Sequence, residues 1–456
     1  MAEVAPTPDA FDIEVETLIV GAGACGLIAA LAAHEAGQEV LVIEADPVPK
    51  GSTALSAGLI PAAGTALQAE AGIADDAARF AADIQAKAKA KGENDPALVA
   101  ALAEGSAGVI DWLAQRYGLP FSVVSDFDYP GHSRRRMHGL PSRSGAELVD
   151  RLCATVEAQG IDLLCGRRAE ILYHEGHTVT GAGLRAPDGT LETVGCTKLV
   201  LACNGFGGSR DKVAAHMPAI SDALWFGHEG NRGEALDWGA TLGAGTRHLG
   251  AYQGHGNVAH PHGILITWAT ITEGGIQVNR NGKRFWNEAQ GYSEAARVVL
   301  AQPGREAVTI FDARIAGIAR QFEDFRNAEA QGAVRSADTL EDLAAQLDLP
   351  PDALHAEMSA ITPGGTDRFG RLWGETRLTP PYCAVRVTGA LFHTQGGLVT
   401  DGSGRVMATD GAPFPNLFAA GGAACGVSGA GDSGYLSGNG LLAAAVLGRA
   451  AGAAAL

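Results

Sequence analysis

Three glycines and a glutamate near the N-terminus have the types and spacing that a dinucleotide site requires. Gly21, Gly23 and Gly26 form a G-x-G-x-x-G sequence, and Glu44 follows 18 residues after the last of them. In such a motif the first glycine allows a tight turn and the second lets the backbone approach a pyrophosphate. The third allows close packing of a helix against a strand. An acidic residue at this distance accepts hydrogen bonds from a ribose diol.

The residues around these glycines predict the elements that position them. Thr17–Val20 is a short apolar run typical of a strand buried on both faces, Leu27–Ala36 predicts a helix, and Glu39–Ile43 predicts a second strand. The N-terminus of that helix would offer unpaired N–H groups and the positive end of its dipole to phosphates. The complete strand–turn–helix–strand–acid pattern therefore predicts a dinucleotide site.

Length, charge and cysteine usage narrow the class of protein. The 456 residues exceed one compact core, so we expect two or three units. The net charge of −17 argues against nucleic acid or an anionic membrane as partner. The seven cysteines form no C-x-x-C pair and have mostly apolar neighbours, which predicts reduced thiols, a cytoplasmic location and no metal site.

Neither end of the chain has the pattern of a membrane or export segment. The first residues are acidic and lack the apolar core of a signal peptide. The apolar tail Leu441–Leu456 is interrupted by Gly448, Arg449 and Gly452. We therefore expect a packed helix there and no integral membrane segment.

The middle of the chain shows mixed helical and strand patterns. Amphipathic runs predict helices over Thr65–Lys91 and Asp95–Tyr117, and apolar alternation predicts two separate strands, Glu192–Val194 and Lys198–Ala202. Arg134–Arg136 form a basic cluster in an otherwise acidic chain, which either pairs with local acids or binds an anion.

From about Leu249 the character of the chain changes. His-rich and Gly-rich loops appear, and Asn281-Gly282 between apolar-alternating runs predicts a hairpin. The Pro/Gly-rich segment Thr362–Tyr382 predicts a return crossing, after which short strands and Gly-rich turns resume. The simplest interpretation is a nucleotide-binding domain interrupted by an insert.

Several motifs occur in an order that is specific to one family. They are GAGACG with Glu44, GSTALSAG, LACNGFGG, VNRNGKRFWNE, HTQGG, TDGSGRV, PNLFAAGG and SGNGLL. Together they resemble the fumarate reductase/succinate dehydrogenase flavoprotein superfamily over nearly the whole chain. The resemblance implies an α/β fold with a Rossmann-like FAD-binding domain in two sequence pieces, residues 1–250 and 379–456. An inserted α+β cap (substrate) domain would cover residues 251–378.

The resemblance also implies the cofactor and the residues that hold it. The cofactor would be FAD, and hydride would pass between a substrate carbon and flavin N5. Covalent members carry a histidine in the loop after the second strand, whereas Gly51–Leu55 has none, so noncovalent FAD is expected. The expected FAD-binding residues are Gly21, Gly23, Ala24, Cys25, Gly26, Glu44, Ala45, Gly51, Ser52, Thr53, Ser56, Ala57, Gly58, Ala169, Ala202, Asn204, Gly205, Asn231, Gly421, Gly422, Asn439, Gly440, Leu441 and Leu442.

Two departures from the fumarate reductase pattern concern the substrate. Tyr292 stands at the position of the proton-donating arginine, soon after Asn287-Glu288, and Tyr435 stands at the position of the carboxylate-binding arginine. Tyrosine offers neither a permanent cation nor a fork that matches a carboxylate, which argues against fumarate or succinate. The two tyrosines instead resemble those of 3-ketosteroid dehydrogenases (Δ1 and Δ4-(5α) types), the latter especially in Tyr435-Leu436-Ser437-Gly438.

That resemblance assigns roles to the tyrosines. Tyr292 would remove a proton α to a ketone, and Tyr435 with the N–H of Gly440 or Asn439 would bind the carbonyl oxygen. An oxyanion hole of this kind is worth roughly 3–4 kcal/mol. His393 matches a substrate-binding histidine of the fumarate reductase pattern.

A base at position 292 needs assistance. An ordinary phenol, with a pKa near ~10, is a poor base at neutral pH, so a donor or a charge must lower its pKa. The candidates are Tyr129, His138 or an arginine of Arg134–Arg136.

Three functions remain open from the sequence. The first is FAD-dependent α,β-dehydrogenation, or the reverse ene reduction, of a cyclic ketone or enone such as a 3-oxosteroid or a cyclohexanone-type compound. The second is a related reaction of an anionic substrate, with Arg134–Arg136 and His393 replacing the missing arginines. The third is FAD binding without turnover. The chain has no haem motif or iron–sulfur cysteine cluster, so either reaction requires an external electron acceptor.

Overall fold

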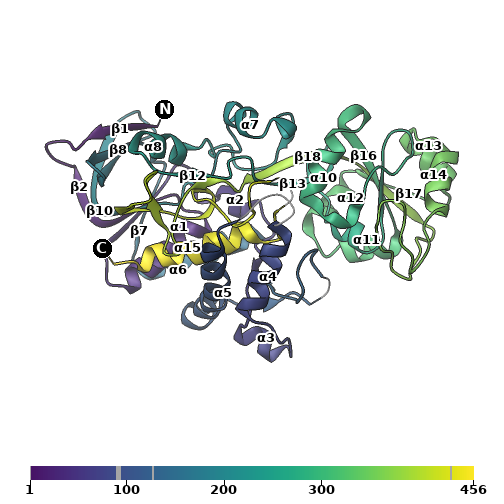
Figure 1. The fold of residues 1–456 in the computed structure, drawn as a ribbon, viewed down its shortest axis with the longest axis horizontal. Coiled ribbons are helices and arrows are strands. Elements are labelled where there is room, and N and C mark those ends of the chain that lie inside the picture. Colours follow the sequence, from purple (N-terminus) through teal and green to yellow (C-terminus); the bar gives the residue numbers. More distant parts are fainter. Residues whose placement is uncertain (1, 89–93, 126–127, 432–433, 456) are drawn as a thin grey trace. The chain divides into compact units, whose positions relative to one another are not determined.

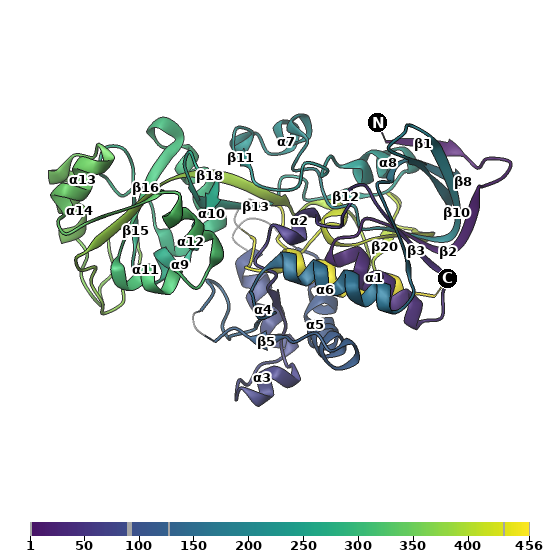
Figure 2. The same cartoon turned by 180° about the vertical axis from the view of Figure 1, so that it is seen from behind.

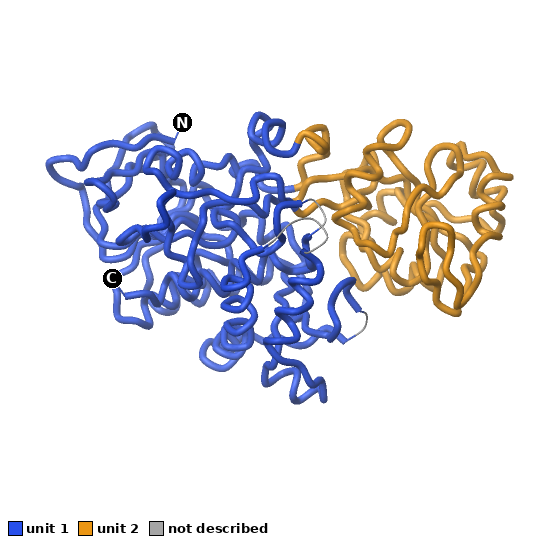
Figure 3. The backbone as a smooth tube through the Cα atoms, in the orientation of Figure 1, with its two compact units in different colours: residues 1–217, 227–252, 393–456 blue, residues 218–226, 253–392 orange. Residues whose placement is uncertain are grey.

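The computed structural model describes residues 2–88, 94–125, 128–431 and 434–455. They form two compact units (Figures 1 and 3). Unit 1 contains residues 1–217, 227–252 and 393–456, and unit 2 contains residues 218–226 and 253–392. The chain leaves unit 1 within β13 (Tyr252–Ala259) and returns within β18 (Tyr382–Thr394).

A parallel sheet forms the centre of unit 1. Its strands are ordered β7-β3-β2-β10-β21, and every neighbouring pair is parallel. The apolar ends of β2 and β3 are buried, as the sequence predicts for strands covered on both faces. The bounds are β2 Ile13–Val20, β3 Val40–Glu44, β7 Asp162–Cys165, β10 Leu191–Leu201 and β21 Pro413–Ala419.

Three helices lie side by side in unit 1: α1 (Ala24–Glu35), α6 (Gly145–Ala158) and α15 (Asn439–Ala453) (Figures 1 and 2). The glycines that interrupt the apolar tail allow the close contact of α15 with α1. A Cβ on Gly452 would lie 2.1 Å from the carbonyl oxygen of Ala29, and one on Gly448 would lie 2.7 Å from that of Cys25. The tail is therefore a packed helix, as expected.

The remaining elements of unit 1 extend the sheet or cover it. β9 pairs antiparallel with both β8 and β10, and α5 packs against α4 and α15. Their bounds are β1 Glu3–Pro6, α2 Gly51–Ala54, β4 Ile60–Pro61, α3 Ala66–Glu70, α4 Ala77–Ala88, α5 Pro96–Tyr117, β5 Ser122–Val123, β6 Met137–Gly139, β8 Arg168–Glu175, β9 Thr178–Arg185, α7 Arg210–His216, α8 Glu234–Leu242, β12 Thr246–Arg247, β19 Gly397–Leu398 and β20 Arg405–Met407.

Two secondary-structure predictions for unit 1 were wrong. The helix predicted over Thr65–Lys91 is two helices, α3 and α4, because the chain turns at Gly72, whose φ is +70°. Its predicted end at residues 89–91 lies outside the described residues. The two strands predicted over residues 192–194 and 198–202 are one strand, β10, which pairs with β9 in its first half and with β21 in its second.

Within the described ranges, α5 is the one helix long and apolar enough to cross a membrane. Length and composition alone are weak evidence, and 44% of its most apolar window is buried. Asp95 caps its N-terminus, Gly118 ends it with a φ of +68°, and Leu102 and Ile110 lie in the core of unit 1.

Unit 2 is an α+β unit around a mixed sheet of order β14-β13-β18-β16-β15. Alternation along β16 (Glu306–Asp312) divides its core, because Phe311 packs with Phe325 in one cluster and Ile310 packs with Leu343 in another. The other bounds are β11 Leu224–Trp225, β14 Ile264–Leu265, α9 Ala269–Thr272, β15 Ile276–Val278, α10 Tyr292–Leu300, α11 Ala313–Ala319, α12 Glu323–Ala330, β17 Val334–Ala337, α13 Leu340–Leu347 and α14 Pro351–Ser359.

The hairpin predicted at Asn281-Gly282 is present in unit 2 as a turn with an isolated antiparallel bridge between Val278 and Arg284. The N–H of Asn279 donates to the carbonyl oxygen of Lys283 over 2.9 Å, and Gly282 has a φ of +68°. The segment Thr362–Tyr382, predicted as the return crossing, lies within unit 2, and the unit border falls at residues 392 and 393.

Candidate active site

Two glycines of the N-terminal motif are required by the fold itself. Gly21 follows β2 with a φ of +108°, and a Cβ on it would lie 2.6 Å from the carbonyl oxygen of Ala202. A Cβ on Gly26 would lie only 1.8 Å from the carbonyl oxygen of Gly21. Glycine at these two positions therefore allows the turn and the close contact of helix α1 with it.

Gly23 is different, because neither its conformation nor its neighbours require glycine. Its φ is −74°, which any residue can adopt, and an added Cβ would meet only Thr53 Oγ1, at 3.4 Å. Gly23 precedes α1, and its backbone lies at the N-terminus of that helix, where a pyrophosphate would bind. A ligand that must approach the backbone closely would explain why position 23 is a glycine.

Glu44 lies beside this turn at the end of β3, 9% exposed. Its Oε2 accepts from the N–H of Ala22 over 2.8 Å, and its Oε1 accepts from the N–H of Asp46 over 2.9 Å. The two bonds fix the carboxylate, and each oxygen keeps further acceptor capacity for a ribose hydroxyl.

The loop after β3 is tied to the same turn. Thr53 Oγ1, in α2, accepts from the N–H of Ala24, the first residue of α1, over 3.1 Å. Ser52 Oγ accepts from Asn231 Nδ2 over 2.7 Å. The other predicted residues of this loop, Ala45, Gly51, Ser56, Ala57 and Gly58, follow in the same segment, and Ser56 Oγ accepts from the N–H of Gly58.

A second group of predicted residues meets at the ends of β10 and β21. A Cβ on Gly422 would lie 2.2 Å from Asn204 Oδ1, and one on Gly421 would lie 3.3 Å from Cys25 Cβ. A Cβ on Gly205 would lie 2.0 Å from Thr394 Oγ1. Asn204 therefore lies beside Gly422, and Gly421 lies beside the first turn of α1. Of the remainder, Ala169 is buried in β8, and Leu441 and Leu442 belong to α15.

Asn439, the first residue of α15, carries a buried amide group with no partner in the described parts of the chain. The residue is 1% exposed, and neither Oδ1 nor Nδ2 has a hydrogen bond there. A buried amide without partners costs about 1–3 kcal/mol, so its presence indicates a group that it binds.

Tyr435 and Gly440 lie together at the N-terminal end of α15. Tyr435 is buried, which raises its pKa to about 12 even though the backbone N–H groups of Gly440 and Gly438 donate to its hydroxyl and act in the opposite direction. Gly438 is the N-cap residue of α15, with a φ of +84°. The phenol and two backbone donors therefore form one polar cluster, with Ser437 buried in the same turn.

His393 packs against this turn. Its ring lies edge-on to that of Tyr435, with 6.0 Å between centroids, and a Cβ on Gly440 would lie 2.3 Å from its Nε2. Nδ1 donates to the carbonyl oxygen of Thr394 over 2.7 Å, and Gln395 Nε2 lies 3.0 Å from Nε2. Burial lowers the pKa of His393, so the ring is neutral.

Tyr292 belongs to unit 2, where it opens helix α10. Its ring stacks on His255, with 4.8 Å between centroids and 18° between planes, and His255 stacks in turn on Phe392 at 5.3 Å. His255 Nδ1 accepts from the N–H of Asn257 over 3.2 Å, and burial lowers its pKa to about 3, so this ring is also neutral. His255 could not be predicted from the sequence, since a lone histidine in a Gly-rich stretch carries no spacing signal.

A buried ion cluster holds the segment that leads to Tyr292. Glu288 is fully buried and pairs with Arg284 at 2.6 Å and with Arg371 at 3.1 Å. Arg284 also pairs with Asp367 at 2.7 Å. The Asn287-Glu288 motif thus has a structural role in unit 2.

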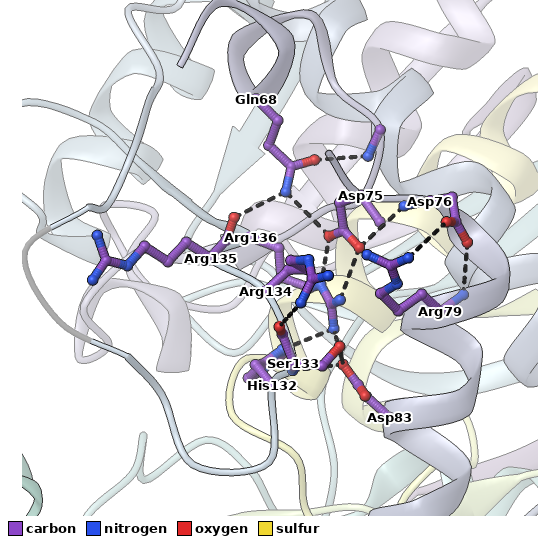
Figure 4. A network of polar contacts seen from close by, with 12 residues as sticks. Gln68, Asp75, Asp76, Arg79, Asp83, His132, Ser133, Arg134, Arg135 and Arg136 are labelled. Atoms are coloured by element: carbon purple, nitrogen blue, oxygen red, sulfur yellow. Dashed lines mark hydrogen bonds and ion pairs between the residues drawn. The ribbon is translucent and has the colours of Figure 1, made fainter. Parts of the chain in front are cut away.

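The basic cluster Arg134–Arg136 is occupied by contacts within unit 1 (Figure 4). Arg136 is 1% exposed and pairs with Asp75 at 2.9 Å and Asp83 at 2.5 Å. Arg134 donates to carbonyl oxygens of Ala74 and Ser133. Arg135 pairs with Asp128 at 2.9 Å. Pairing with local acids, one of the two alternatives from the sequence, accounts for Arg135 and Arg136, and these contacts do not favour an anionic substrate.

His138 and Tyr129, the other candidates for assisting Tyr292, also lie in unit 1. His138 is fully buried between Thr65 Oγ1, at 2.8 Å, and the carbonyl oxygen of Arg136, at 2.9 Å. Burial raises the pKa of Tyr129. The contacts of His138 are those of a structural residue that joins β6 to the start of α3.

His138 should make the stability of unit 1 sensitive to acid. Burial lowers its pKa to about 4, below the value of ~6.5 in an unfolded chain. The unfolded chain therefore binds a proton first as the pH falls, and roughly 2–3 kcal/mol of stability is lost between pH 6.5 and 4. We expect the urea midpoint of a His138→Asn variant to vary less over this range than that of the wild type. His262→Asn, which removes an exposed histidine of unit 2, is the control.

A family model described as "FAD binding domain" matches residues 16–441. The chain belongs to this family of FAD-binding proteins. Its cofactor is FAD, which confirms the resemblance to the fumarate reductase/succinate dehydrogenase flavoproteins.

Known relatives of this flavoprotein are oxidoreductases. It is 30% identical to the probable fumarate reductase Ifc3 of Shewanella frigidimarina, over 96% of this chain and 74% of that protein. It is 26% identical to 4-oxocyclohexanecarboxylate 2-dehydrogenase of Sinomonas cyclohexanicum, over 96% of this chain and 93% of that protein. The flavoprotein is therefore an FAD-dependent oxidoreductase.

Two solved structures share its fold. The open conformation of a flavocytochrome c3 fumarate reductase superposes with a TM-score of 0.81 at 28% identity, covering 97% of this chain and 78% of the other. The 3-ketosteroid-Δ4-(5α)-dehydrogenase of Rhodococcus jostii RHA1 superposes with a TM-score of 0.76 at 24% identity, covering 99% of both chains. The latter likeness concerns the fold alone.

The residues of unit 1 fit FAD. Gly23 has no side chain between its backbone and a pyrophosphate, Glu44 is fixed as an acceptor for a ribose, and the amide of Asn439 has polar atoms available to a ligand. When bound, FAD supplies a two-electron acceptor for hydride.

Substitution of Gly23 should remove FAD without unfolding the protein. A Cβ there has no backbone atom within 4 Å and meets only Thr53 Oγ1, at 3.4 Å, but a valine side chain would stand between the backbone and a pyrophosphate. We expect Gly23→Val to purify colourless, with a wild-type circular dichroism spectrum and no flavin released on denaturation. Gly317→Val, in α11 of unit 2, is the control, because a Cβ there meets nothing within 4 Å. A yellow Gly23→Val protein would place the pyrophosphate elsewhere.

Proposed function

We propose that this flavoprotein catalyses α,β-dehydrogenation, or the reverse ene reduction, of a cyclic ketone such as a 3-oxosteroid or a cyclohexanone-type compound. The observation that carries the proposal is the cluster at the start of α15, where the Tyr435 hydroxyl lies against the N–H groups of Gly438 and Gly440. A phenol and backbone N–H groups stabilise the negative oxygen of an enolate. They lack the permanent charge and fork of arginine that a carboxylate requires.

Each tyrosine has one role in this proposal. Tyr435 donates a hydrogen bond to the carbonyl oxygen, which stabilises the enolate that forms when the α-proton leaves. Tyr292, as phenolate, accepts that proton, and hydride leaves the β-carbon, so a C=C bond forms and the substrate loses two electrons. Bound FAD is the hydride acceptor. We further propose that unit 1 is the FAD-binding domain and unit 2 the cap. The expected pieces were 1–250 with 379–456 and 251–378, whereas residues 218–226 and 379–392 belong to unit 2.

The neutral state of the surrounding histidines supports this chemistry. Burial lowers the pKa of His393 beside Tyr435 and of His255 beside Tyr292, so neither ring is a cation near neutral pH. Neutral histidines can accompany a neutral ketone, but they provide no positive charge to pair with the carboxylates of a dicarboxylate. The names of the relatives support the proposal in part. One relative is named as a dehydrogenase of a cyclic ketone, 4-oxocyclohexanecarboxylate, whereas another is named as a probable fumarate reductase.

Anaerobic stopped-flow mixing of the oxidised flavoprotein with a substrate panel tests the proposal. We expect flavin bleaching by a 3-oxosteroid or by a cyclohexanone-type ketone and none by succinate. Bleaching by succinate alone would replace the proposal with the anionic-substrate function. No bleaching by any compound, with FAD tightly bound, would favour an FAD-binding protein without turnover. An external acceptor must reoxidise the flavin, and noncovalent FAD should appear in the supernatant after denaturation.

A further inference from the structure

The turn before α15 is held by a histidine that the proposed reaction does not use. His132 is half-buried, and its Nε2 lies 2.9 Å from the carbonyl oxygen of Ser437. A carbonyl oxygen only accepts, so Nε2 carries the proton and donates. On the same side, a Cβ on Gly131 would lie 2.7 Å from Leu436 Cδ1, so the two chain segments are in close contact.

Arg136 fixes the state of this histidine (Figure 4). Arg136 Nη1 lies 3.4 Å from His132 Nδ1, and a guanidinium can only donate, so Nδ1 must be the unprotonated nitrogen. The guanidinium is held in turn by the carboxylates of Asp75 and Asp83. Burial and the nearby cation lower the pKa of His132 to about 4, which agrees with a neutral ring protonated at Nε2.

The Ser437–Gly438 peptide connects His132 to Tyr435. Its C=O accepts from His132, and its N–H, which belongs to Gly438, donates to the Tyr435 hydroxyl. A peptide group is planar, so fixing the direction of the C=O fixes that of the N–H. Gly438 has a φ of +84°, and glycine leaves the peptide before it free to adopt other orientations. Something outside the turn must therefore select the observed one.

We infer that His132 is a positioning residue that locks the Ser437–Gly438 peptide with its N–H directed at the Tyr435 hydroxyl. Arg136, Asp75 and Asp83 hold His132 in the tautomer that donates. This inference deepens the proposed function and rests on the carbonyl-binding role of Tyr435. It also assigns a role to Arg136, the buried residue of the Arg134–Arg136 cluster, which acts on the turn through His132.

The expected consequence concerns the acidity of Tyr435. An N–H that donates to a phenol oxygen stabilises the phenolate and makes the O–H a better donor to a substrate carbonyl. Without His132 the buried carbonyl of Ser437 loses its partner, and the peptide can rotate its N–H away from Tyr435. The phenol of Tyr435 should then become a weaker acid and a weaker donor.

Incorporation of 3,5-difluorotyrosine at position 435 measures this directly, because fluorine lowers the phenol pKa into a range where the protein stays folded. We expect His132→Phe, which keeps a ring beside Phe80 but removes the donor, to decrease the acid dissociation constant roughly tenfold by ¹⁹F NMR. His132→Gln, whose amide reaches the position of Nε2, should return the titration toward the wild type. Arg134→Gln, which changes an exposed arginine of the same segment, should leave it unchanged.

Kinetics supply the second readout. In otherwise native protein, His132→Phe should slow flavin reduction by a cyclic ketone about tenfold, but should have little further effect in a Tyr435→Phe background. Equal slowing in both backgrounds, or an unchanged ¹⁹F titration in folded His132→Phe protein, would overturn the inference. If His132→Phe does not fold, the same two measurements are compared between His132→Gln and His132→Asn, whose shorter amide does not reach the position of Nε2. The inference is overturned if the two variants give the same titration and the same reduction rate. Because the titration needs no ketone, it separates failure of this inference from failure of the proposed function.

Discussion

Tyr292→Phe is expected to slow flavin reduction by a cyclic ketone by roughly 10²–10⁴-fold, the range for loss of a general base. The substitution removes one hydroxyl and keeps the ring, so the stack on His255 should persist. Binding of a ketone mimic should remain largely intact, because the carbonyl oxygen is assigned to Tyr435. Stopped-flow reduction and equilibrium binding of the mimic measure the two quantities separately.

The pH profile gives a second, independent test of Tyr292. The wild-type reduction rate should rise with pH as the base loses its proton, and Tyr292→Phe should lose this dependence. Tyr382→Phe, which removes the hydroxyl of another half-buried tyrosine of unit 2, is the matched control and should keep both the rate and the profile. Near-normal reduction by Tyr292→Phe with FAD bound would remove this tyrosine from the mechanism.

Tyr435→Phe is expected to slow flavin reduction by roughly 10²–10³-fold, as for loss of one oxyanion donor. Unlike Tyr292→Phe, it should also weaken the binding of phenol-like and enolate-like inhibitors, because these place a partial negative charge where the hydroxyl donates. The ring contact with His393 is kept, so the turn before α15 should not rearrange. Inhibitor titration followed by flavin absorbance measures the loss.

The control for Tyr435 is Tyr173→Phe, because Tyr173 is buried in unit 1 and packs edge-on against Phe11, far along the chain from the turn. It should retain wild-type reduction and inhibitor binding. If both active-site tyrosines prove replaceable while variants of Arg134–Arg136 are inactive, the ketone proposal is wrong and the anionic-substrate function stands. Inactivity of an Arg136 variant alone does not support that function, because loss of Arg136 leaves the carboxylates of Asp75 and Asp83 without their partner.

Local sequence patterns were sufficient to predict the N-terminal nucleotide motif. α1 and β3 lie within three residues of the predicted ranges, and β2 begins four residues before its predicted start, because a buried strand and a helix start leave short, regular signals in neighbouring residues. The same holds for the packed C-terminal helix and the turn at Asn281-Gly282. Predictions failed where the extent of a strand depends on the strands that pair with it. β10 is one continuous strand because β9 pairs with its first half and β21 with its second half.

Motif order and residue type are local properties, and they were enough to predict the family and the cofactor and to single out the two tyrosines as candidates. The contacts that these residues make depend on the tertiary fold. Gly23 and Gly26 are equivalent letters in one motif, yet only Gly26 is required by packing. Arg136 looked available to an anion, but Asp75 and Asp83 occupy it. His132 and Ser437 are 305 positions apart, and no local pattern reports a hydrogen bond between them, because such a bond depends on how the whole of unit 1 folds.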